Sequence, residues 1–222
     1  IERSDDAGIE LAKSLLESQA GHRPVTLVAY SMGSRTVYSC LKELARHQEL
    51  WEDQQEEERR KREGGGGAEV DAASASNDKK KNKKSPEIME YAREPASIIE
   101  DVIVMGMPNH LSLTSWKACR RIIAGRLVHC YSRKDLILSL MFQYKRLTRA
   151  FLPVCGTCAI DVPGVENYDV TDLVPSHADY CLMTGEILRL VKHGQPRPRR
   201  PSTVGEEVVS DGKTQAVEPV SR

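Results

Sequence analysis

A serine lies between two small residues in the segment 29–33, which reads Ala-Tyr-Ser-Met-Gly. The apolar, β-rich run Val25–Tyr30 leads into this serine, and apolar residues at helical spacing follow it. A strand, a sharp turn with serine at its tip and a helix make up a nucleophile elbow, in which small residues two positions before and after the serine prevent clashes. The pattern predicts that Ser31 is a nucleophile for acyl transfer, although Ala29 stands where glycine is usual. The alternative is a serine in a tight turn without chemistry.

The helix expected after Ser31 would direct its N-terminal N–H groups and the positive end of its dipole at the reacting group. The backbone N–H of Met32 is therefore predicted to donate one hydrogen bond to an oxyanion. In folds with such an elbow the second donor comes from a loop after an earlier strand. No such loop is recognisable in the sequence, and we expect it upstream of residue 1.

A nucleophilic serine needs a base, and the base needs an acid that orients it. In folds with this elbow the chain order is serine, then aspartate or glutamate, then histidine. His177 follows the last predicted strand, in a loop before the last predicted helix, which is the position of the base in that order. The alternative is a capping or surface histidine. The other histidines lie before the elbow, on its helix, within a strand, too early in the chain or at a helix end: His22, His47, His129, His110 and His193.

Asp135 is the predicted acid, because it closely follows the apolar run 127–131 in the segment Tyr-Ser-Arg-Lys-Asp. A loop at that place carries the acid in this arrangement. Asp172 and Asp169 compete for the role, but they lie on or just after the last predicted strand, close to His177 along the chain. The remaining candidates are expected to cap helices, lie at the surface or make local hydrogen bonds: Asp161, Asp179 and Asp101.

Six cysteines, at 40, 119, 130, 155, 158 and 181, lie mostly in apolar surroundings, which indicates a reducing compartment rather than a disulfide scaffold. Cys155 and Cys158 form a CxxC pattern, but a redox pair would open a helix, and the flanking run Val154–Ile160 is predicted to be extended. A structural zinc would need a second ligand pair, and none stands at suitable spacing. We expect two cysteines in a loop or edge strand, and neither metal nor cofactor.

The chain has 222 residues, 40% of them apolar, and a formal net charge of zero. No global charge therefore favours nucleic acid as a partner. The first residue is Ile rather than Met, so we expect a fragment or a processed product. No signal peptide opens the chain, and no run approaches the roughly 18 apolar residues of a membrane helix. The longest candidate is Leu136–Phe142.

Short apolar runs alternate with helical periodicities, which is typical of parallel βαβ units. Strands are predicted at Val25–Tyr30, Ile98–Met105, Leu127–Tyr131 and Val165–Val170. Helices are predicted at Gly8–Ser18, from Gly33 to Glu63, at Leu113–Ile123, Leu136–Leu147 and Ala178–Val191. Right-handed crossovers would place these helices on both faces of one sheet. The fold class is therefore predicted as α/β, the C-terminal part of an α/β-hydrolase-like parallel sheet.

The predicted elements divide the chain into four segments. Residues 1–63 carry a helix, the elbow strand and its helix, and residues 87–193 carry the remainder of the domain. Residues 64–86 are low in complexity and lack apolar periodicity, so they are predicted to be disordered, as is the tail 194–222. The basic run Lys79–Lys84 could attract acids, phosphates or a membrane, but a solvated insertion is the preferred interpretation.

Five blocks of sequence carry a family resemblance: RPVTLVAYSMGSR (23–35), IIEDVIVMGMP (98–108), the block from Trp116 to Arg126, YSRKD (131–135) and the block 164–180, from GVENYDV to SHADY. In this order they resemble the eukaryotic transmembrane and coiled-coil domain-containing protein 4 family, also known as domain of unknown function 726. The resemblance implies a membrane protein with an α/β-hydrolase-like domain, whose hydrophobic spans precede the elbow. Ser31, Asp135 and His177 fall on matching blocks. Leu136, where relatives usually have an aromatic residue, and the long insertion are departures.

Two functions remain open. One is a serine hydrolase of esterase or lipase type, for which a membrane-associated parent favours lipid esters. The other is a non-catalytic scaffold or interaction module at a membrane, because fold alone does not decide function. The survival of all three triad members in order favours the enzyme. We expect membrane attachment through segments outside this chain and a domain that faces the cytoplasm. Without the first strands of the sheet and one oxyanion donor, residues 1–222 alone are expected to be marginally stable or inactive.

Overall fold

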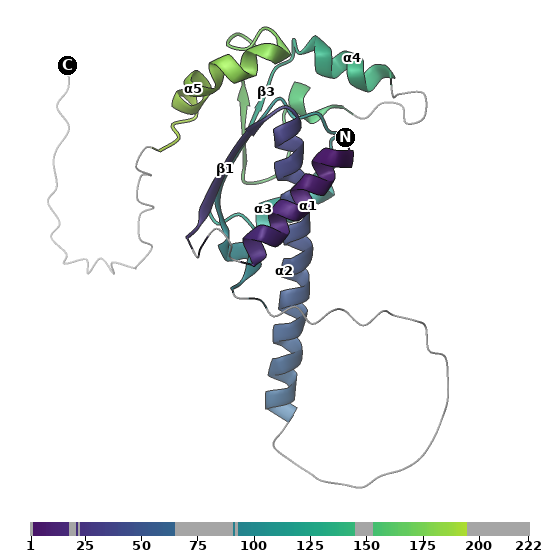
Figure 1. Ribbon diagram of the computed structural model, residues 1–222, viewed down its shortest axis with the longest axis vertical. Coiled ribbons are helices and arrows are strands. Elements are labelled where there is room, and N and C mark those ends of the chain that lie inside the picture. Colours follow the sequence, from purple (N-terminus) through teal and green to yellow (C-terminus); the bar gives the residue numbers. More distant parts are fainter. Residues whose placement is uncertain are drawn as a thin grey trace, which may run out of the picture.

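The computed structural model describes residues 2–17, 21, 23–64, 91, 93–144 and 153–194 (Figure 1). The predicted insertion 64–86 and tail 194–222 lie outside this part of the chain, except for their first residues, and so do His22 and the end of the helix predicted to reach Leu147.

Four strands form one parallel sheet in the order β1-β2-β3-β4. The strands are β1 (Val25–Tyr30), β2 (Ile99–Met105), β3 (Leu127–Tyr131) and β4 (Val165–Asp169). Because the strands are parallel and adjacent in chain order, each connection must cross back over the sheet, and all four carboxyl ends meet at one edge. Tyr30 pairs with Met105, Met105 with Cys130 and Tyr131 with Asp169 at that edge. The predicted α/β class with a parallel sheet is confirmed.

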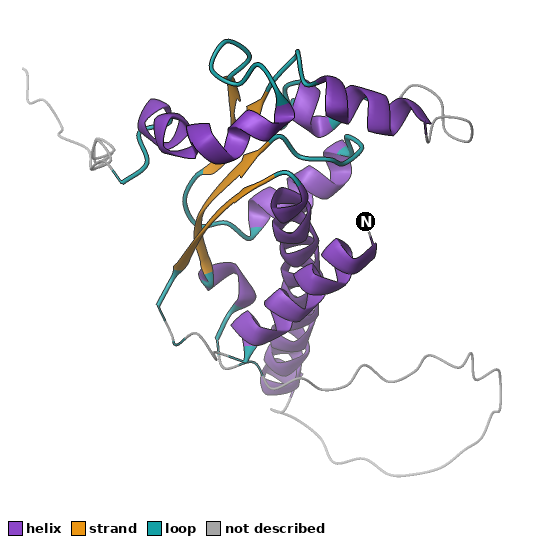
Figure 2. Cartoon of the chain, turned by 45° about the horizontal axis from the view of Figure 1, so that its top comes forward, coloured by secondary structure: helices purple, strands orange, loops and turns teal. Residues whose placement is uncertain are grey.

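Helices cover both faces of this sheet, as predicted. The helices α1 (Glu2–Leu16), α2 (Met32–Gly64) and α3 (Leu113–Arg121) pack on one face, over side chains such as Val104. The helix α5 (Tyr180–Leu190) packs on the other face, over side chains such as Ile103. The alternation of Ile103 and Val104 between the two cores follows from the two-residue period of a strand. Figure 2 shows α1 and α2 crossing on one side of the strands.

The helix α1 crosses α2 at Gly8, where a Cβ would lie only 2.4 Å from the carbonyl oxygen of Thr36 and 2.5 Å from Cβ of Ser39. The absence of a side chain lets the two helix backbones approach each other. At the same crossing, Arg35 makes an ion pair with Asp5 at 2.6 Å, and Ser39 Oγ donates to the carbonyl of Asp5. These contacts fix α1 against the N-terminal end of α2, next to the elbow.

The second half of α2 extends well beyond the sheet (Figure 1). Almost all of residues 52–63 are exposed. Ion pairs one turn apart, such as Glu56 with Arg60 and Glu57 with Lys61, support it.

Two short segments differ from the predicted elements. The run Val154–Ile160 is not extended throughout, because Cys155–Thr157 form a 3₁₀ helix closed by hydrogen bonds from Thr157 and Cys158. The last helix is preceded by another 3₁₀ helix, His177–Asp179, whose capping box joins Ser176 and Asp179. Within the described residues, no helix is long and apolar enough to cross a membrane.

Candidate active site

Ser31 occupies the turn between β1 and α2 with a backbone φ of 51°. An L-residue in this region is strained, at a cost on the order of 1–3 kcal/mol, unless the surrounding structure holds it there. Ser31 N donates to the carbonyl of Met105 at 2.9 Å, which ties the turn to β2. The turn therefore has the sharp geometry that the elbow pattern predicts.

The buried side chain of Ser34 holds the same turn in place through hydrogen bonds. Its buried Oγ lies 2.9 Å from the carbonyl oxygen of Ala29 and 3.0 Å from that of Met105, so its single hydrogen is shared between them. It also accepts a hydrogen bond from Met105 N at 3.1 Å. Ser34 thus joins the end of β1, the end of β2 and the first turn of α2. Sequence reasoning missed this residue, because a serine on a helix gives no signal that its side chain faces a neighbouring strand.

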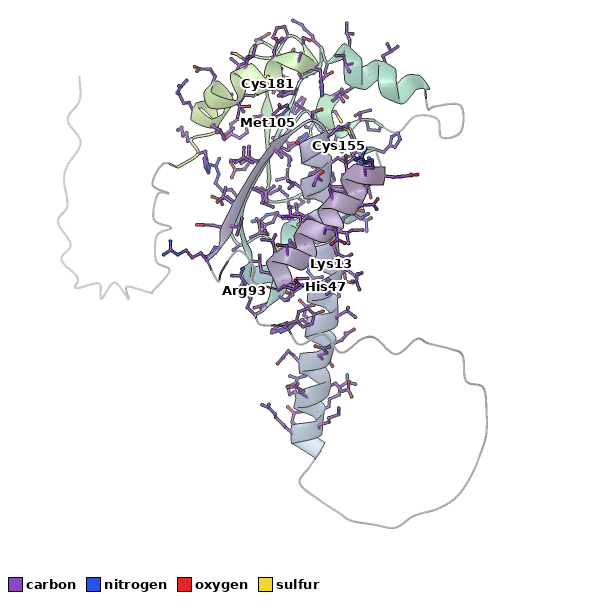
Figure 3. The ribbon with its side chains drawn as sticks, viewed as in Figure 1. Lys13, His47, Arg93, Met105, Cys155 and Cys181 are labelled. Atoms are coloured by element: carbon purple, nitrogen blue, oxygen red, sulfur yellow. The ribbon has the colours of Figure 1, made fainter. Side chains whose placement is uncertain are left out.

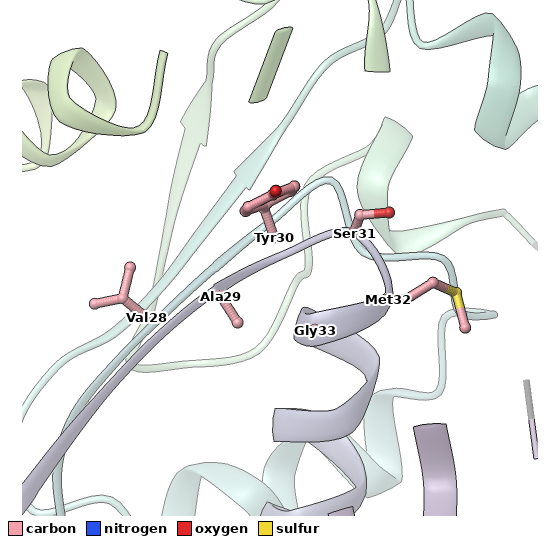
Figure 4. A pocket seen from close by; sticks show the side chains of 6 residues that line it. All are labelled: Val28, Ala29, Tyr30, Ser31, Met32 and Gly33. Atoms are coloured by element: carbon pink, nitrogen blue, oxygen red, sulfur yellow. The ribbon is translucent and has the colours of Figure 1, made fainter. Parts of the chain in front are cut away.

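The two small residues of the pattern face each other across the elbow (Figure 4). A Cβ placed on Gly33 would lie 3.6 Å from Cβ of Ala29, which is ordinary contact, and so larger side chains at these two positions would collide. This explains why alanine is tolerated at position 29. A pocket of about 520 Å³ adjoins the turn, lined by residues 28–33. Val28 and Tyr30, on its wall, are exposed by 40% and 42%.

His177 and Asp135 converge on Ser31. His177 Nε2 lies 2.7 Å from Ser31 Oγ, and His177 Nδ1 lies 2.6 Å from Asp135 Oδ2. A carboxylate can only accept, so the proton is on Nδ1 and Nε2 is free to accept from the serine hydroxyl. The side chain of Asp135 is 1% exposed and that of His177 is 13% exposed. The three side chains can therefore transfer a proton from serine to imidazole in a site largely shielded from water.

Asp135 is held by the helix that follows it, α4 (Leu136–Tyr144). Its Oδ1 accepts from Leu138 N at 3.0 Å, and its carbonyl accepts from Ser139 N at 3.1 Å. Asp135 therefore acts as the N-cap of α4 through one carboxylate oxygen and contacts His177 through the other. Neither oxygen is left unpaired in the interior.

Ser132 links the loop that carries Asp135 to the loop that carries His177. Its side chain is buried, and Oγ donates to the carbonyl of Val174 at 3.0 Å. Its backbone N–H donates to the carbonyl of Gly156 in the 3₁₀ helix Cys155–Thr157. Sequence reasoning did not single out Ser132. The only feature of the sequence that pointed to Ser132 was its position between a buried strand and Asp135.

The ring of Tyr180 packs against the imidazole of His177. Its ring makes an edge contact with His177, with centroids 5.8 Å apart and planes at 73°. Burial, and next the nearby carboxylate of Asp135, raise the pKa of Tyr180 above its usual value. Gly106 provides the space for this ring, because it has a φ of 53° and a Cβ there would lie 2.4 Å from Tyr180 Cε2.

Several of the other candidate histidines and aspartates have different partners. His47 lies 2.8 Å from the hydroxyl of Tyr91, and His129 bonds Asn167. Asp169 accepts from Thr171 and pairs with Arg133, Asp179 Oδ2 accepts from Ser176 N, and Asp101 accepts from Arg126 N. Met32 begins α2, so its N–H has no partner within the helix. Its role as an oxyanion donor remains a prediction.

All six cysteines are free thiols. Burial raises the pKa of Cys155 to about 12, so this thiol is not a reactive thiolate. Cys155 lies in the interior, while Cys181 is exposed on α5 (Figure 3). Among the described residues, no group of three or more His, Cys, Asp or Glu side chains could hold a metal ion.

Comparison with known proteins finds a family and several longer relatives. The family described as "Protein of unknown function (DUF726)" matches residues 1–52 and 88–194. The transmembrane and coiled-coil domain-containing protein STS1 of Oryza sativa is 34% identical over 188 residues, which cover 85% of this chain and 21% of STS1. The "Probable lipase MIL1" of Saccharomyces cerevisiae is 26% identical over 192 residues, covering 86% of this chain and 13% of MIL1.

An "Uncharacterized membrane protein", F35D11.3 of Caenorhabditis elegans, is 25% identical over 194 residues, covering 86% of this chain and 24% of that protein. The chain thus spans a quarter or less of the length of these relatives. No solved structure matches it.

Proposed function

For a chain that belongs to the DUF726 family of proteins of unknown function, we propose the activity of a serine hydrolase that cleaves lipid esters. The observation that carries the proposal is the continuous hydrogen-bonded chain from Ser31 through His177 to Asp135, with distances of 2.7 Å and 2.6 Å. These side chains come from three separate connections: the turn after β1, the loop after β3 and the 3₁₀ helix after β4. Their order along the chain is that of folds with a nucleophile elbow.

The reaction follows from these contacts. Ser31 Oγ attacks the carbonyl carbon of the ester while its proton passes to His177 Nε2. Asp135 keeps the Nδ1 proton in place and stabilises the imidazolium that forms. The Met32 N–H stabilises the negative oxygen of the tetrahedral intermediate. The alcohol then leaves with the proton held by His177. Water, activated by the same imidazole, releases the acid from the acyl-serine and restores the free hydroxyl.

Lipid esters are the proposed substrate class for two reasons. The pocket beside Ser31 is bordered by the half-exposed side chains of Val28 and Tyr30, which suit an apolar acyl group. A relative that matches 86% of this chain is named a probable lipase, and others are named membrane proteins. We propose the same membrane setting here, with attachment through segments outside this chain and the hydrolase-like domain on the cytoplasmic side.

A hydrolysis assay tests the proposal. The protein is assayed on p-nitrophenyl esters of increasing acyl length. We expect faster turnover of the longer acyl chains, and a fall in kcat of about a thousandfold or more in Ser31→Ala and in His177→Gln. Ser97→Ala, which changes an exposed serine just before the amino end of β2, is the matched control. Equal turnover in Ser31→Ala and the parent would overturn the proposal and favour a non-catalytic interaction module.

A further inference from the structure

A pocket of about 260 Å³ lies between the end of α3 and the residues that lead into β4. Three of the residues that line it are basic, and the other two are apolar: Lys117, Arg120, Arg121, Val162 and Pro163. The two arginines follow the lysine by three and four positions on α3, so the three side chains share one face of that helix. The apolar pair precedes the amino end of β4, and the pocket therefore lies at the edge of the sheet opposite to the elbow. We call it the α3 pocket.

The guanidinium of Arg120 is held in one orientation while it keeps its charge. Its Nε donates to the carbonyl of Gly164 at 3.0 Å, and its Nη1 donates to the carbonyl of Ile123 at 2.6 Å. Gly164 has a φ of 84°, and a Cβ there would lie 2.8 Å from Arg120 Nε, so the missing side chain leaves room for this contact. Both partners are neutral carbonyls, and no carboxylate of the described residues pairs with Arg120. Three of the five N–H donors of the guanidinium therefore stay available.

The carboxylates near the α3 pocket compensate its positive charge only in part. Lys117 is exposed, and within the part of the chain that the structure describes its ammonium group has no hydrogen bond or ion pair. Arg121 pairs with Glu52 at 3.1 Å, but their side chains are 59% and 44% exposed, so the pair is weak and an incoming anion can compete with it. Asp161 is exposed just before the apolar wall, and among the described residues it pairs with none of the three cations. Lys117 and Arg120 thus offer charge and donors that the fold does not use.

We propose that the α3 pocket binds the phosphate group of a phosphomonoester. Such a group carries between about one and two negative charges at pH 7 and three strong acceptor oxygens, which match the unused donors of Lys117 and Arg120. A carboxylate, with one charge and two oxygens, would use fewer of them. The pocket is larger than a phosphate, so part of the group that carries the phosphate would contact Val162 and Pro163. Because the pocket lies at the opposite edge of the sheet from Ser31, this binding stands or fails separately from hydrolysis.

Titration of the 222-residue chain with glycerol 3-phosphate, followed by ¹⁵N NMR at constant ionic strength, tests the proposal. We expect the signals of the Arg120 Nε–H and the Gly164 amide to shift, with half-saturation at or below about 1 mM. Lys117→Gln should weaken binding about tenfold, because it removes a charge-assisted donor. The Lys117 side chain is exposed and unpaired in the described structure, so the fold should persist, which circular dichroism verifies. Lys134→Gln, which changes an exposed lysine at the carboxyl edge of the sheet, is the matched control and should bind like the parent.

Further arms identify the source of the phosphate. Co-sedimentation with phosphatidylcholine vesicles that contain phosphatidic acid, lost in Lys117→Gln, would assign it to a lipid headgroup. Binding of glycerol 3-phosphate without such co-sedimentation would assign it to a soluble phosphomonoester. Three results would overturn the proposal: no shift of either signal up to about 20 mM glycerol 3-phosphate, equal affinity in the parent and Lys117→Gln, or equal shifts with sodium acetate at the same ionic strength.

Discussion

At the scale of single residues, a few side chains hold Ser31 and His177 in place. The strained φ of Ser31 is held by its own N–H on Met105 and by the buried hydroxyl of Ser34. On the other side of the site, Asp135 and Tyr180 fix the imidazole of His177 in position and in tautomer. Most of these groups are buried, so the geometry is fixed without a bound ligand. This is the preorganisation that a catalytic serine requires.

Gly106→Ala tests the support of the imidazole at this scale. The new methyl would meet the ring of Tyr180 at 2.4 Å in a backbone with φ of 53°, so Tyr180 must move and His177 with it. We expect a loss of about 2 kcal/mol in the free energy of unfolding, measured with urea, and about a tenfold fall in ester turnover.

Gly194→Ala is the control for Gly106→Ala, because its φ is also positive, at 75°, but nothing lies within 4 Å of its Cβ. It should cost about 1 kcal/mol and leave turnover unchanged. Equal effects of the two substitutions would show that backbone strain alone, and not the position of Tyr180, matters at Gly106.

At the scale of elements, the strands and helices were largely predictable. The apolar runs are separated by Gly and Pro, so β1 and β3 have the predicted bounds and β2 and β4 differ by one residue. The 3₁₀ helix Cys155–Thr157 was not predictable, because it depends on tertiary bonds such as that from Ser132 N to the carbonyl of Gly156. Likewise Ser34 bonds the carbonyl of Met105, 71 positions away, and Tyr180 needs the space left by Gly106 at the end of another strand. Such partners leave no local pattern.

The crossing of α1 and α2 gives a prediction at this scale. Gly8→Ala would place a methyl 2.4 Å from a backbone oxygen of α2 and force the helices apart. We expect the free energy of unfolding, measured in urea by circular dichroism, to fall by about 2 kcal/mol. Gly185→Ala, within α5, meets nothing within 4 Å and should be neutral or stabilising by up to about 1 kcal/mol. If Gly8→Ala changed the free energy of unfolding no more than Gly185→Ala does, the close approach of the two helices would be contradicted.

At the scale of the whole molecule, the order of the three residues along the chain explains how they come together. Ser31, Asp135 and His177 are far apart in sequence, and each follows a different strand of a parallel sheet whose carboxyl ends share one edge. That is why their convergence could be predicted from order alone. The pocket beside Ser31, by contrast, depends on which side chains of β1 remain uncovered, such as those of Val28 and Tyr30. The sequence could not specify this, because both lie in a run that is typical of a buried strand.

The stability of the whole fold should depend on His129 in acid. Burial lowers the pKa of His129 from 6.5 to about 4, with its Nδ1 bonded to Asn167. Between these values the unfolded chain binds the proton and the folded chain does not. The neutral His129 imidazole therefore contributes fully to the free energy of unfolding above about pH 6.5. This contribution is lost as the pH falls to about 4, a change of about 3 kcal/mol.

Guanidinium unfolding at pH 7 and pH 4.5 measures this change. His129→Asn retains an N–H donor toward Asn167 but cannot titrate, so acidification should weaken it clearly less than the parent protein. His193→Asn, at an exposed position, is the matched control. Equal losses in the parent and His129→Asn would exclude His129 as the source.

The most direct test of the central claim is covalent labelling by a fluorophosphonate, with the modified residue identified by mass spectrometry. The proposal predicts one adduct on Ser31, its absence in Ser31→Ala, a severe loss in His177→Gln and full labelling of Ser97→Ala. A folded protein that stays unlabelled while a known serine hydrolase reacts in the same tube, or one labelled at a different serine, would contradict it.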